Sequence, residues 1–470
     1  MPHLAHELVV AATGAAVTRV GARSFAGVVH DSRAALPGSL YFAIRGERVD
    51  GHDFVAQAEA AGAAGVVVAR GRGAATVAAT ASVAVFEVDD PILALGRLAR
   101  AWRRSLPVKI VALTGSVGKT STKEMLAAIF VAAVGEAAVH KTRGNLNNHI
   151  GVPLTLLGLE PAHRYAVVEL GMSSLGEIAY LESMTHPDVA VVTRVAGVHL
   201  EQLGTLQNVG RAKGEIFEGR ASTGAAFAIS PIGEHLLYES LQRVPADRQR
   251  TFGAGSADFA VRHARLDGDS TLIGLNLQGK SLDVRLSLLG AHHATNAAAA
   301  AAAATVLGID ERSVAAGLAS VATEKHRMQA LAIGGRTIID DCYNASPPSM
   351  RAALDAMAAI GGTSARRVAI LGDMFELGPG GPAEHAAIGR YAGERANEVI
   401  GIGGLSQDTV AGARALLGEH AVHAADPEDA ARRALGVSSP GDVLLVKGSR
   451  GMKLERVIEA IQRLSADGNV

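Results

Sequence analysis

Residues 108–123, which read VKIVALTGSVGKTSTK, decide the fold of this 470-residue chain. The stretch begins as an apolar, strand-like run, passes through the glycine-containing segment 114–121 and then becomes helical in pattern. Glycines let backbone N–H groups close around phosphate oxygens, and the start of a helix adds positive charge. Lys119 would add further charge, and the Thr120 hydroxyl is a suitable Mg2+ ligand. The pattern therefore predicts a phosphate-binding loop for a nucleoside triphosphate.

The loop departs from the usual spacing in one position. The common pattern has glycine at position 113, whereas this chain has Leu113 there and its glycine at Gly115. A glycine-rich turn without a ligand is the alternative interpretation. Because Gly-Lys-Thr directly follows a strand, nucleotide binding is favoured.

Length and pattern together predict an α/β protein with three domains. A chain of 470 residues exceeds what one core usually organises. Short apolar runs such as 65–69 and 83–88 alternate with helical patterns up to Pro107, which breaks a helix expected over 91–104. We therefore expect a small α/β domain over residues 1–107.

The second predicted domain, residues 108–323, contains the phosphate loop. Strands at 166–169 and 189–193 alternate with helices, which is typical of a largely parallel sheet that binds the nucleotide at its carboxyl ends. Between residues 251 and 289 the pattern changes to hairpins, so we expect a small antiparallel part. The alanine run 297–304 predicts a close-packed buried helix.

A third βα series follows Thr323 and predicts a C-terminal Rossmann-like domain over residues 324–470. Its expected strands are 336–340, 367–371, 398–402 and 442–446.

Charge and cysteine content restrict the partners. The formal net charge is −1, which argues against a surface that binds nucleic acid or acidic membranes. Cys342 is the only cysteine, so an internal disulfide is excluded and a reducing, cytoplasmic location is favoured. The N-terminal run lacks a basic leader and is interrupted by His6 and Glu7, so we expect neither a signal peptide nor membrane insertion.

Several polar residues follow predicted strands and have more than one interpretation. Glu169 ends an apolar strand beside the phosphate loop, a position that suits Mg2+ binding. His199 also follows a strand, although a lone histidine there is more often a packing or surface residue. Lys213 has the spacing of an ordinary solvated helix lysine.

Two polar clusters each have two interpretations that the local sequence does not separate. Asn145, Asn147 and Asn148 form either a turn or a binding site for a sugar or peptide. The Asp-Ser-Arg segment 31–33 either caps a helix or binds a diphosphate.

Seven segments in order resemble one family, the Mur ligases of peptidoglycan synthesis, along nearly the whole chain. They are TGSVGKTSTKEM (114–125), NLNNHIGVPLTLL (145–157), VVELGMSSLGEIAYL (167–181), AKGEIF (212–217), DDCYNASPPSM (340–350), LGDMFELG (371–378) and VKGSRGMKLE (446–455). The resemblance implies a UDP-precursor-binding domain, a central ATP-binding domain and a C-terminal ligase domain.

The activity implied by the resemblance is ATP-dependent amide-bond formation through an acyl phosphate. The implied small-molecule substrates are UDP-N-acetylmuramoyl-tripeptide and D-alanyl-D-alanine, handled by a monomer without nucleic acid. A sister ligase that adds a single amino acid, or a folylpolyglutamate-synthase-like ligase, is the alternative. The absence of an Asp-Asn-Pro-Arg segment argues against the sister that adds the third residue, and the N-terminal Asp-Ser-Arg argues against the folate enzyme.

The resemblance also assigns roles to residues. It implies ATP binding by Gly115, Ser116, Val117, Gly118, Lys119, Thr120, Ser121, Asn296, Arg327 and Asp341. It implies substrate binding by Asp31, Ser32, Arg33, Asn145, Asn147, Asn148, Tyr343 and Asn344. It implies Mg2+ ligation by Thr120, Glu169 and His199, and catalysis by Lys119, Glu169, His199 and Lys213. The Lys213 amine would carry a carbamate formed from CO2, which turns a cation into an anion.

One segment departs from the family. Where the family commonly has a Pro-Gly-Arg hinge, residues 324–328 read EKHRM, so only Arg327 is kept and glycine's conformational freedom is missing. Further along, Lys447, Ser449 and Arg450 are candidates for selecting the dipeptide, with a helix cap as the alternative.

Overall fold

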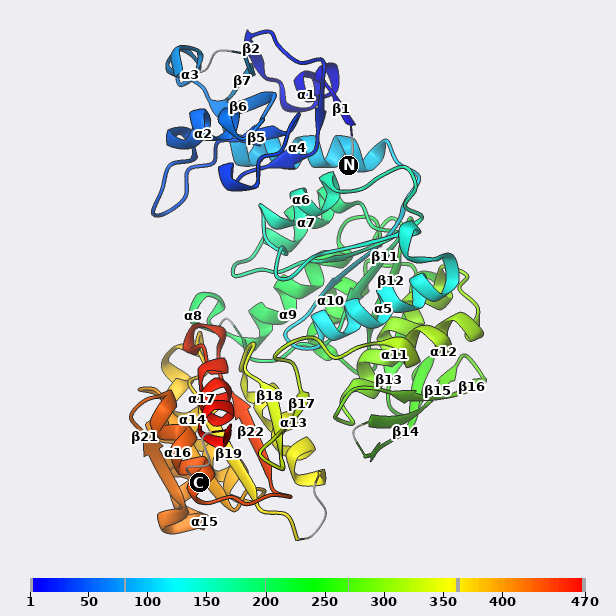
Figure 1. Cartoon of the computed structure of the whole chain (residues 1–470). Coiled ribbons are helices and arrows are strands. Elements are labelled where there is room, and N and C mark those ends of the chain that lie inside the picture. The colour runs from blue at the N-terminus through cyan, green and yellow to red at the C-terminus, as the bar shows by residue number, and fades with distance from the viewer. Residues whose placement is uncertain (1–2, 80–81, 199, 269, 361–363, 467–470) are drawn as a thin grey trace.

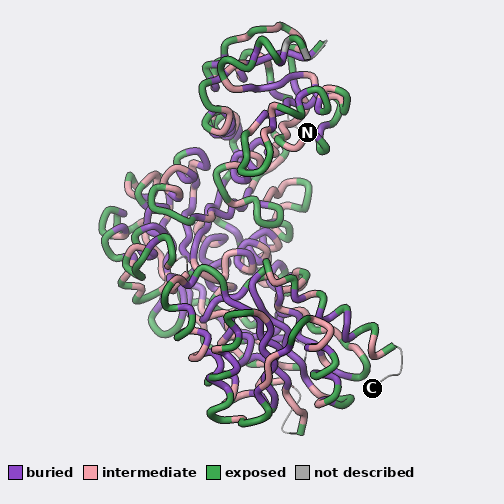
Figure 2. The backbone as a smooth tube through the Cα atoms, turned by 90° about the vertical axis from the view of Figure 1, so that its left-hand side faces the viewer, coloured by how far each residue is buried: buried purple, intermediate pink, exposed green. Residues whose placement is uncertain are grey.

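A computed structural model describes residues 3–79, 82–198, 200–268, 270–360 and 364–466. The chain forms three bodies that follow one another along the long axis of the molecule, with the N-terminal body at one end and the C-terminal body at the other (Figure 1). Buried residues concentrate inside each body and exposed residues lie on its surface (Figure 2). The predicted three-part α/β organisation is confirmed.

The N-terminal body is built on a five-stranded sheet of order β2-β7-β6-β5-β4. Strands β4 to β7 run parallel, β2 joins β7 antiparallel, and β1 pairs with β3 in a separate two-stranded ribbon. The predicted strand 65–69 and helix 91–104 are confirmed as β6 and α4. The elements are β1 (His3–Ala5), α1 (His6–Thr13), β2 (Ala16–Arg19), β3 (Ser24–Ala26), β4 (Val28–Val29), β5 (Leu40–Phe42), α2 (Val55–Ala60), β6 (Gly65–Ala69), α3 (Gly73–Ala79), β7 (Ala84–Val88) and α4 (Pro91–Arg104).

Helix α4 attaches the N-terminal body to the central one. Asp90 caps its first turn by accepting hydrogen bonds from the next backbone N–H groups, and Leu95 and Leu98 are buried in a core that also includes central-domain residues. In its last turn the buried Arg103 guanidinium donates to the carbonyls of Thr185 (3.1 Å) and His186 (3.2 Å). The connection between the two bodies is therefore packed and hydrogen-bonded.

The central body contains a nine-stranded sheet of order β16-β15-β14-β13-β12-β11-β8-β10-β9. Strands β8 to β14 are parallel, while β14, β15 and β16 form the predicted hairpins and extend the same sheet. Strand β8 lies between β10 and β11, the kind of position where open α/β sheets bind ligands at the carboxyl ends of their strands. The phosphate loop follows β8 directly.

The central elements are β8 (Lys109–Thr114), α5 (Lys119–Val134), β9 (Val139–Lys141), α6 (Gly151–Leu157), β10 (Tyr165–Glu169), α7 (Glu177–Thr185), β11 (Val189–Val192), α8 (Leu200–Leu203), α9 (Leu206–Gly214), β12 (Phe227–Pro231), α10 (Tyr238–Leu241), β13 (Gln249–Gly253), β14 (Phe259–Asp267), β15 (Ser270–Leu277), β16 (Lys280–Leu286), α11 (His293–Val306) and α12 (Glu311–Ser320).

The alanine run forms the predicted buried helix. Residues 297–304 lie within α11 and are fully buried, in one core with residues of α5 and of the sheet. Alanine has the highest helix propensity, and its small side chain lets a helix approach its neighbours closely. The run thus fixes the position of the helix start, where Asn296 lies.

The C-terminal body contains a six-stranded sheet of order β17-β18-β22-β19-β20-β21, parallel except for the β17–β18 pair. All four predicted strands are confirmed within one residue at each end. The elements are β17 (Gln329–Ile333), β18 (Arg336–Asp341), α13 (Pro347–Ala359), β19 (Arg367–Gly372), α14 (Gly381–Gly393), β20 (Glu398–Ile402), α15 (Ser406–Leu417), β21 (Ala421–Ala424), α16 (Pro427–Gly436), β22 (Val443–Lys447) and α17 (Glu455–Ala466).

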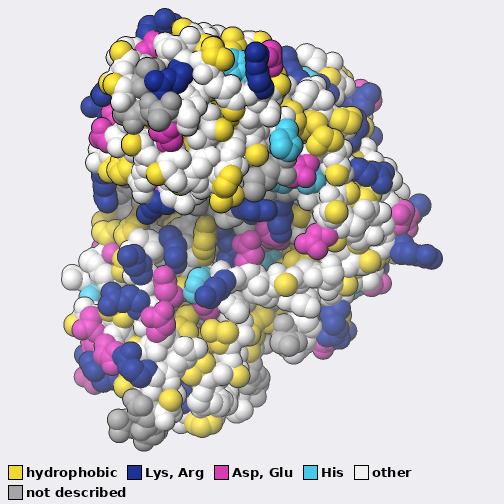
Figure 3. All heavy atoms as spheres, turned by 45° about the horizontal axis from the view of Figure 1, so that its top comes forward, with side chains coloured by type: hydrophobic (Ala, Val, Ile, Leu, Met, Phe, Trp, Pro, Cys, Tyr) yellow, Lys and Arg dark blue, Asp and Glu magenta, His cyan; other side chains and the backbone are white. Residues whose placement is uncertain are grey.

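Acidic and basic side chains are interspersed on the face of the molecule shown in Figure 3. Among the described residues, we find no helix with the length and apolar character needed to cross a bilayer.

Candidate active site

The loop after β8 has the backbone shape that only glycine adopts easily. Gly115 has φ +149° and Gly118 has φ +86°. A Cβ atom at Gly115 would lie 2.0 Å from Thr193 Oγ1, and one at Gly118 would lie 2.5 Å from Asn296 Oδ1. Leu113, which stands where the usual pattern has glycine, is a buried residue of β8. The tight turn therefore begins after the strand, at Gly115.

Lys119, the first residue of α5, folds back over this loop. Its Nζ donates a hydrogen bond to the Gly115 carbonyl at 2.7 Å. Burial lowers the pKa of Lys119, and Arg327 adds to this effect, while the charge of Glu169 opposes it. The side chain of Lys119 therefore lies against the loop.

Two hydroxyl groups tie the loop to the segment after β11, an arrangement that sequence analysis did not predict. Ser116 Oγ donates to the Ala196 carbonyl at 2.8 Å and accepts from the Ala196 N–H at 3.0 Å. Thr193 Oγ1 donates to the Val117 carbonyl at 2.7 Å. These bonds hold the loop against the segment that follows β11.

Glu169, Thr120 and Asn147 meet at the carboxyl end of β10. Thr120 Oγ1 donates to Glu169 Oε2 at 3.2 Å, and Asn147 Nδ2 donates to Glu169 Oε1 at 3.0 Å. The Glu169 side chain is buried, with Lys123 Nζ 3.9 Å from Oε2. Carboxylate and hydroxyl oxygens are the ligands that Mg2+ prefers. Residues predicted for metal and precursor binding are therefore brought together.

Lys213, near the end of α9, is buried rather than solvated, so its interpretation as an ordinary surface lysine is wrong. Burial lowers the pKa of Lys213 well below its usual range, and the charge of Lys119 lowers it further. The carboxylates of Glu169, Glu177 and Glu215 oppose this effect. His199, predicted as a metal ligand, lies outside the described residues.

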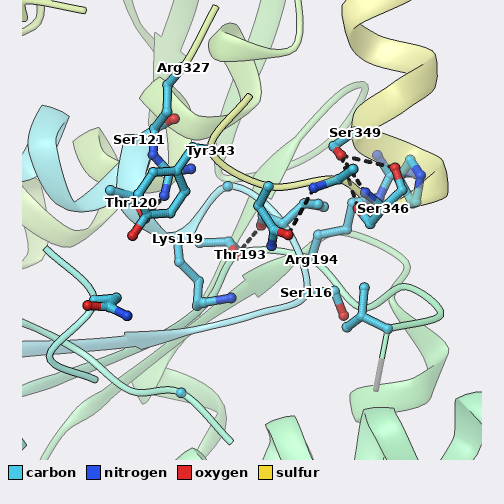
Figure 4. A pocket seen from close by; sticks show the side chains of 18 of the residues that line it. Ser116, Lys119, Thr120, Ser121, Thr193, Arg194, Arg327, Tyr343, Ser346 and Ser349 are labelled. Carbon is cyan, nitrogen blue, oxygen red and sulfur yellow. Dashed lines mark hydrogen bonds between the residues drawn. The ribbon is translucent and has the colours of Figure 1, made fainter. Parts of the chain in front are cut away.

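The C-terminal body supplies Arg327 and Asp341. An Arg327 guanidinium nitrogen donates to Thr120 Oγ1 at 3.1 Å, and the guanidinium carbon lies 4.0 Å from the centre of the Tyr343 ring. Figure 4 shows Arg327 and Tyr343 next to Thr120. Asp341 Oδ2 accepts from Lys447 Nζ at 2.5 Å. Burial raises the pKa of Asp341, and Lys447 opposes this rise.

Residues of the central and C-terminal bodies line a cavity of about 790 Å3, although Gly115, which is also predicted to bind ATP, is not among them. The predicted residues that line it are Ser116, Val117, Gly118, Lys119, Thr120, Ser121, Asn145, Asn147, Asn148, Glu169, Lys213, Asn296, Arg327, Asp341, Tyr343 and Asn344. Lys447, Ser449 and Arg450 line it as well. The cavity is large enough for a nucleotide with part of a second substrate.

The Asp-Ser-Arg segment is not among the residues that line this cavity. Asp31 caps a short 3-10 turn by accepting from the Arg33 N–H at 2.9 Å, and it pairs with the Arg33 guanidinium at 2.7 Å. Hydrogen bonds from Arg33 lower the pKa of Asp31 to about 2. Ser32 Oγ donates to Gln57 Oε1 at 3.0 Å. The capping interpretation is confirmed, and the diphosphate interpretation stays a prediction.

Sequence analysis missed His292 and His293, which line the cavity at the start of α11. Burial lowers the pKa of His292 to about 4, and burial also lowers the pKa of His293 well below its usual range. Neither ring nitrogen of His293 has a hydrogen-bond partner among the described atoms. Their spacing was a usable signal, because His293 and Asn296 are three residues apart and so lie on one helix face.

Comparison with known proteins agrees with this geometry. The chain matches the family descriptions "Mur ligase family, catalytic domain" over residues 24–103, "Mur ligase middle domain" over 113–304 and "Mur ligase, glutamate ligase domain" over 326–450. The UDP-N-acetylmuramoyl-tripeptide–D-alanyl-D-alanine ligase of Escherichia coli (strain K12) is 37% identical over 439 residues, which cover 93% of this chain and 93% of that protein.

Solved structures show the same relationship. The crystal structure of MurF from Acinetobacter baumannii is 30% identical, with a TM-score of 0.87 over 98% of this chain and 99% of that chain. The MurF ligase of Thermotoga maritima in complex with ADP is 27% identical, with a TM-score of 0.81 over 94% of this chain and 98% of that chain. With its phosphate loop, its three-part fold and matches that span nearly its whole length, the chain belongs to the Mur ligase family and is an ATP-dependent ligase that forms amide bonds.

Proposed function

We propose that this enzyme joins D-alanyl-D-alanine to UDP-N-acetylmuramoyl-tripeptide and so forms the UDP-linked pentapeptide of peptidoglycan synthesis. The observation that carries the proposal is that a phosphate loop, the Glu169 carboxylate and the C-terminal residues Arg327 and Tyr343 line the same cavity. The named substrates are supported by the relatives of high coverage that carry this activity in their names.

Each of the three bodies binds one substrate in this reaction. Residues 1–107 bind the UDP end of the precursor through Asp31, Ser32 and Arg33, and residues 108–323 bind ATP. Residues 324–470 bring the dipeptide. Asn145, Asn147 and Asn148 would hold the peptide end of the precursor, because they line the cavity next to Glu169. A monomer in the cytoplasm is part of the proposal, and the single cysteine supports that location.

The residues at the end of β10 fit Mg2+. Glu169 is buried and has its two oxygens within hydrogen-bond reach of Thr120 and Asn147, so it offers a negatively charged oxygen site that a hard cation would complete. Thr120 and Glu169 would hold the ion, with His199 as a proposed ligand of a second one. When bound, Mg2+ supplies positive charge that stabilises the phosphate oxygens.

The buried surroundings of Lys213 suit the formation of a carbamate on its amine. Only a neutral amine reacts with CO2, and burial shifts Lys213 toward that neutral form. The carbamate would place a negative charge in the cavity, in which Lys119 is a neighbouring cation. The group would act as a further carboxylate that orients cations in the site.

The chemistry follows from the charges that must be brought together. A carboxylate is a poor acyl donor, so the precursor carboxylate attacks the γ-phosphate of ATP and ADP leaves, while Lys119 offsets the repulsion between the two anions. The free amine of the dipeptide then attacks the resulting acyl phosphate, phosphate leaves and the new amide nitrogen loses a proton. Arg327 and Lys447 lie on the C-terminal side of the cavity and supply positive charge there. Closure of this side excludes water, which would otherwise hydrolyse the acyl phosphate.

The test is phosphate release from Mg-ATP by the purified enzyme. UDP-N-acetylmuramoyl-tripeptide and D-alanyl-D-alanine are supplied separately and together, and the UDP-linked product is identified by its mass. We expect release only with both substrates, together with the pentapeptide product. Release that depends instead on a single amino acid or on a folate would leave the ligase assignment intact and overturn the substrate proposal.

A further inference from the structure

Three donor side chains meet at the link between the central and C-terminal bodies, outside the cavity. Asp340 and Cys342 are two residues apart at the end of β18, so their side chains point to the same face. His326 comes from the segment that enters the C-terminal body. His326 Nδ1 lies 2.7 Å from Asp340 Oδ2 and 3.6 Å from Cys342 Sγ, and Cys342 Sγ lies 2.9 Å from Asp340 Oδ1.

The cluster is largely buried and opens to solvent on one side. Asp340 is 2% exposed and Cys342 is fully buried, in one core with Ile338 and Leu454. The His326 side chain keeps 19% of its surface exposed and so gives access from solvent. A metal ion could reach the buried donors from the side on which His326 faces solvent.

The types of ligand atom and the distances between them indicate which metal ion the cluster would bind. Imidazole nitrogen, thiolate sulfur and carboxylate oxygen together suit Zn2+, and the three ligand atoms lie within 4.8 Å of one another. Tetrahedral Zn2+ with ordinary bond lengths separates a nitrogen from a sulfur ligand by about 3.6 Å. The His326 Nδ1 to Cys342 Sγ distance is 3.6 Å. We propose that His326, Asp340 and Cys342 bind one Zn2+ ion, with a water molecule in the fourth position.

Binding needs only a small rearrangement. The His326–Asp340 distance of 2.7 Å and the Cys342–Asp340 distance of 2.9 Å are those of hydrogen bonds, so each must widen by about 0.6 Å for the three ligand atoms to reach one metal ion. The Cys342 thiol loses its proton to solvent as the sulfur–zinc bond forms, because thiolate is the ligand. Glu455 supplies a further acidic group nearby, and its Oε2 atom is buried without a hydrogen-bond partner among the described atoms.

The three proposed ligands lie next to residues that line the nucleotide cavity. His326 and Met328 have positive φ values of +64° and +50°, although neither is glycine. The residues that reach the nucleotide cavity, Arg327 and Asp341, are direct chain neighbours of the three ligands. A metal ion held here would therefore fix the backbone from which Arg327 and Asp341 extend.

The single cysteine makes the site testable by spectroscopy. We would titrate the chelator-treated full-length enzyme with Co2+ and record near-ultraviolet absorption, where a thiolate bound to Co2+ gives a charge-transfer band. Only Cys342 can produce this band, because the chain has no other cysteine. We expect the band to saturate at one Co2+ per chain, and added Zn2+ to remove it.

Variants separate the site from other metal binding. Cys342→Ser should abolish the band, and His326→Ala should keep the thiol but weaken Co2+ binding at least about tenfold. His420→Ala removes a histidine of the same body that is paired with Glu398 instead, and it should leave the band unchanged. A wild-type protein that folds normally but gives no band with excess Co2+ would overturn the proposal and leave a hydrogen-bonded cluster only. An unchanged affinity in His326→Ala would also overturn it.

Discussion

Thr120 and Arg327 are joined by a hydrogen bond of 3.1 Å although they are 207 positions apart in the sequence. Thr120 belongs to the phosphate loop and Arg327 to the C-terminal body. The same threonine hydroxyl donates to Glu169. One hydroxyl group thus connects the loop, the predicted metal ligand and the C-terminal body that is proposed to bring the dipeptide.

Arg327→Lys tests this link. Lysine keeps the charge but loses the planar guanidinium that contacts both Thr120 and the Tyr343 ring. We expect kcat/KM for ATP to fall by roughly 10- to 100-fold, chiefly through KM. The matched control is Arg395→Lys, since Arg395 also lies over a tyrosine ring of the same body, at 3.4 Å, outside the cavity. Equal losses in the two variants would contradict the assignment.

Lys119→Met removes the charge proposed to offset phosphate repulsion. We expect kcat to drop by about 100-fold or more, because a preorganised charge at the reacting phosphate is lost. Steady-state kinetics of phosphate release would measure the change. Lys109→Met, at an exposed lysine on the preceding strand, should retain activity. A Lys119→Met enzyme with full activity would show that the loop lysine is dispensable.

Glu169→Gln should change the response to Mg2+. The amide keeps the shape of the side chain but loses the negative charge, so the Mg2+ concentration for half-maximal activity should rise about tenfold or more. Activity measured across a Mg2+ series gives this value. Glu182→Gln alters another buried glutamate of the central body, one that accepts from the Arg220 N–H and does not line the cavity. It should leave the Mg2+ dependence unchanged.

Lys213→Ala tests the carbamate. Activity should be lost and should return in part when a short-chain carboxylic acid is added, because the acid can occupy the space of the carbamate. Activity assays with and without added acetate measure the rescue. Wild-type-like activity of the variant without added acetate would contradict the proposed carbamate on Lys213.

Stability should fall as the pH decreases from about 6.5 toward 4. Burial, together with the nearby His163, lowers the pKa of His140 to about 4 in the folded protein. The unfolded chain has the ordinary value of about 6.5, so between these values it binds more protons than the folded chain. Each such histidine lowers the free energy of unfolding by up to about 1.4 kcal/mol per pH unit.

His140→Gln isolates one contribution to this pH dependence. Glutamine does not titrate and can keep the hydrogen bond to the Thr155 carbonyl. We expect denaturant unfolding of this variant to show a smaller loss of stability between pH 6.5 and 4 than wild type. His186 and His292, whose pKa values burial also lowers to about 4, should keep part of the slope. An unchanged slope would mean that His140 is not buried as described.

The sequence by itself determined the elements and the phosphate loop. Strand β6, helix α4 and the alanine helix α11 agree with their predictions because hydrophobic periodicity and proline or glycine boundaries are local properties of the chain. Gly115 and Gly118 were identifiable for the same reason, since their positive φ values are requirements of a single turn.

Only the tertiary structure decided which residues are buried together. Local spacing made Lys213 look solvated, yet packing of α9 buries it and lowers its pKa. The Arg327–Thr120 contact and the cluster of His326 with Asp340 and Cys342 join segments that no local pattern relates. Desolvation and proximity depend on how the bodies pack, and they set the charge and reactivity of side chains in ways that the order of residues along the chain does not express.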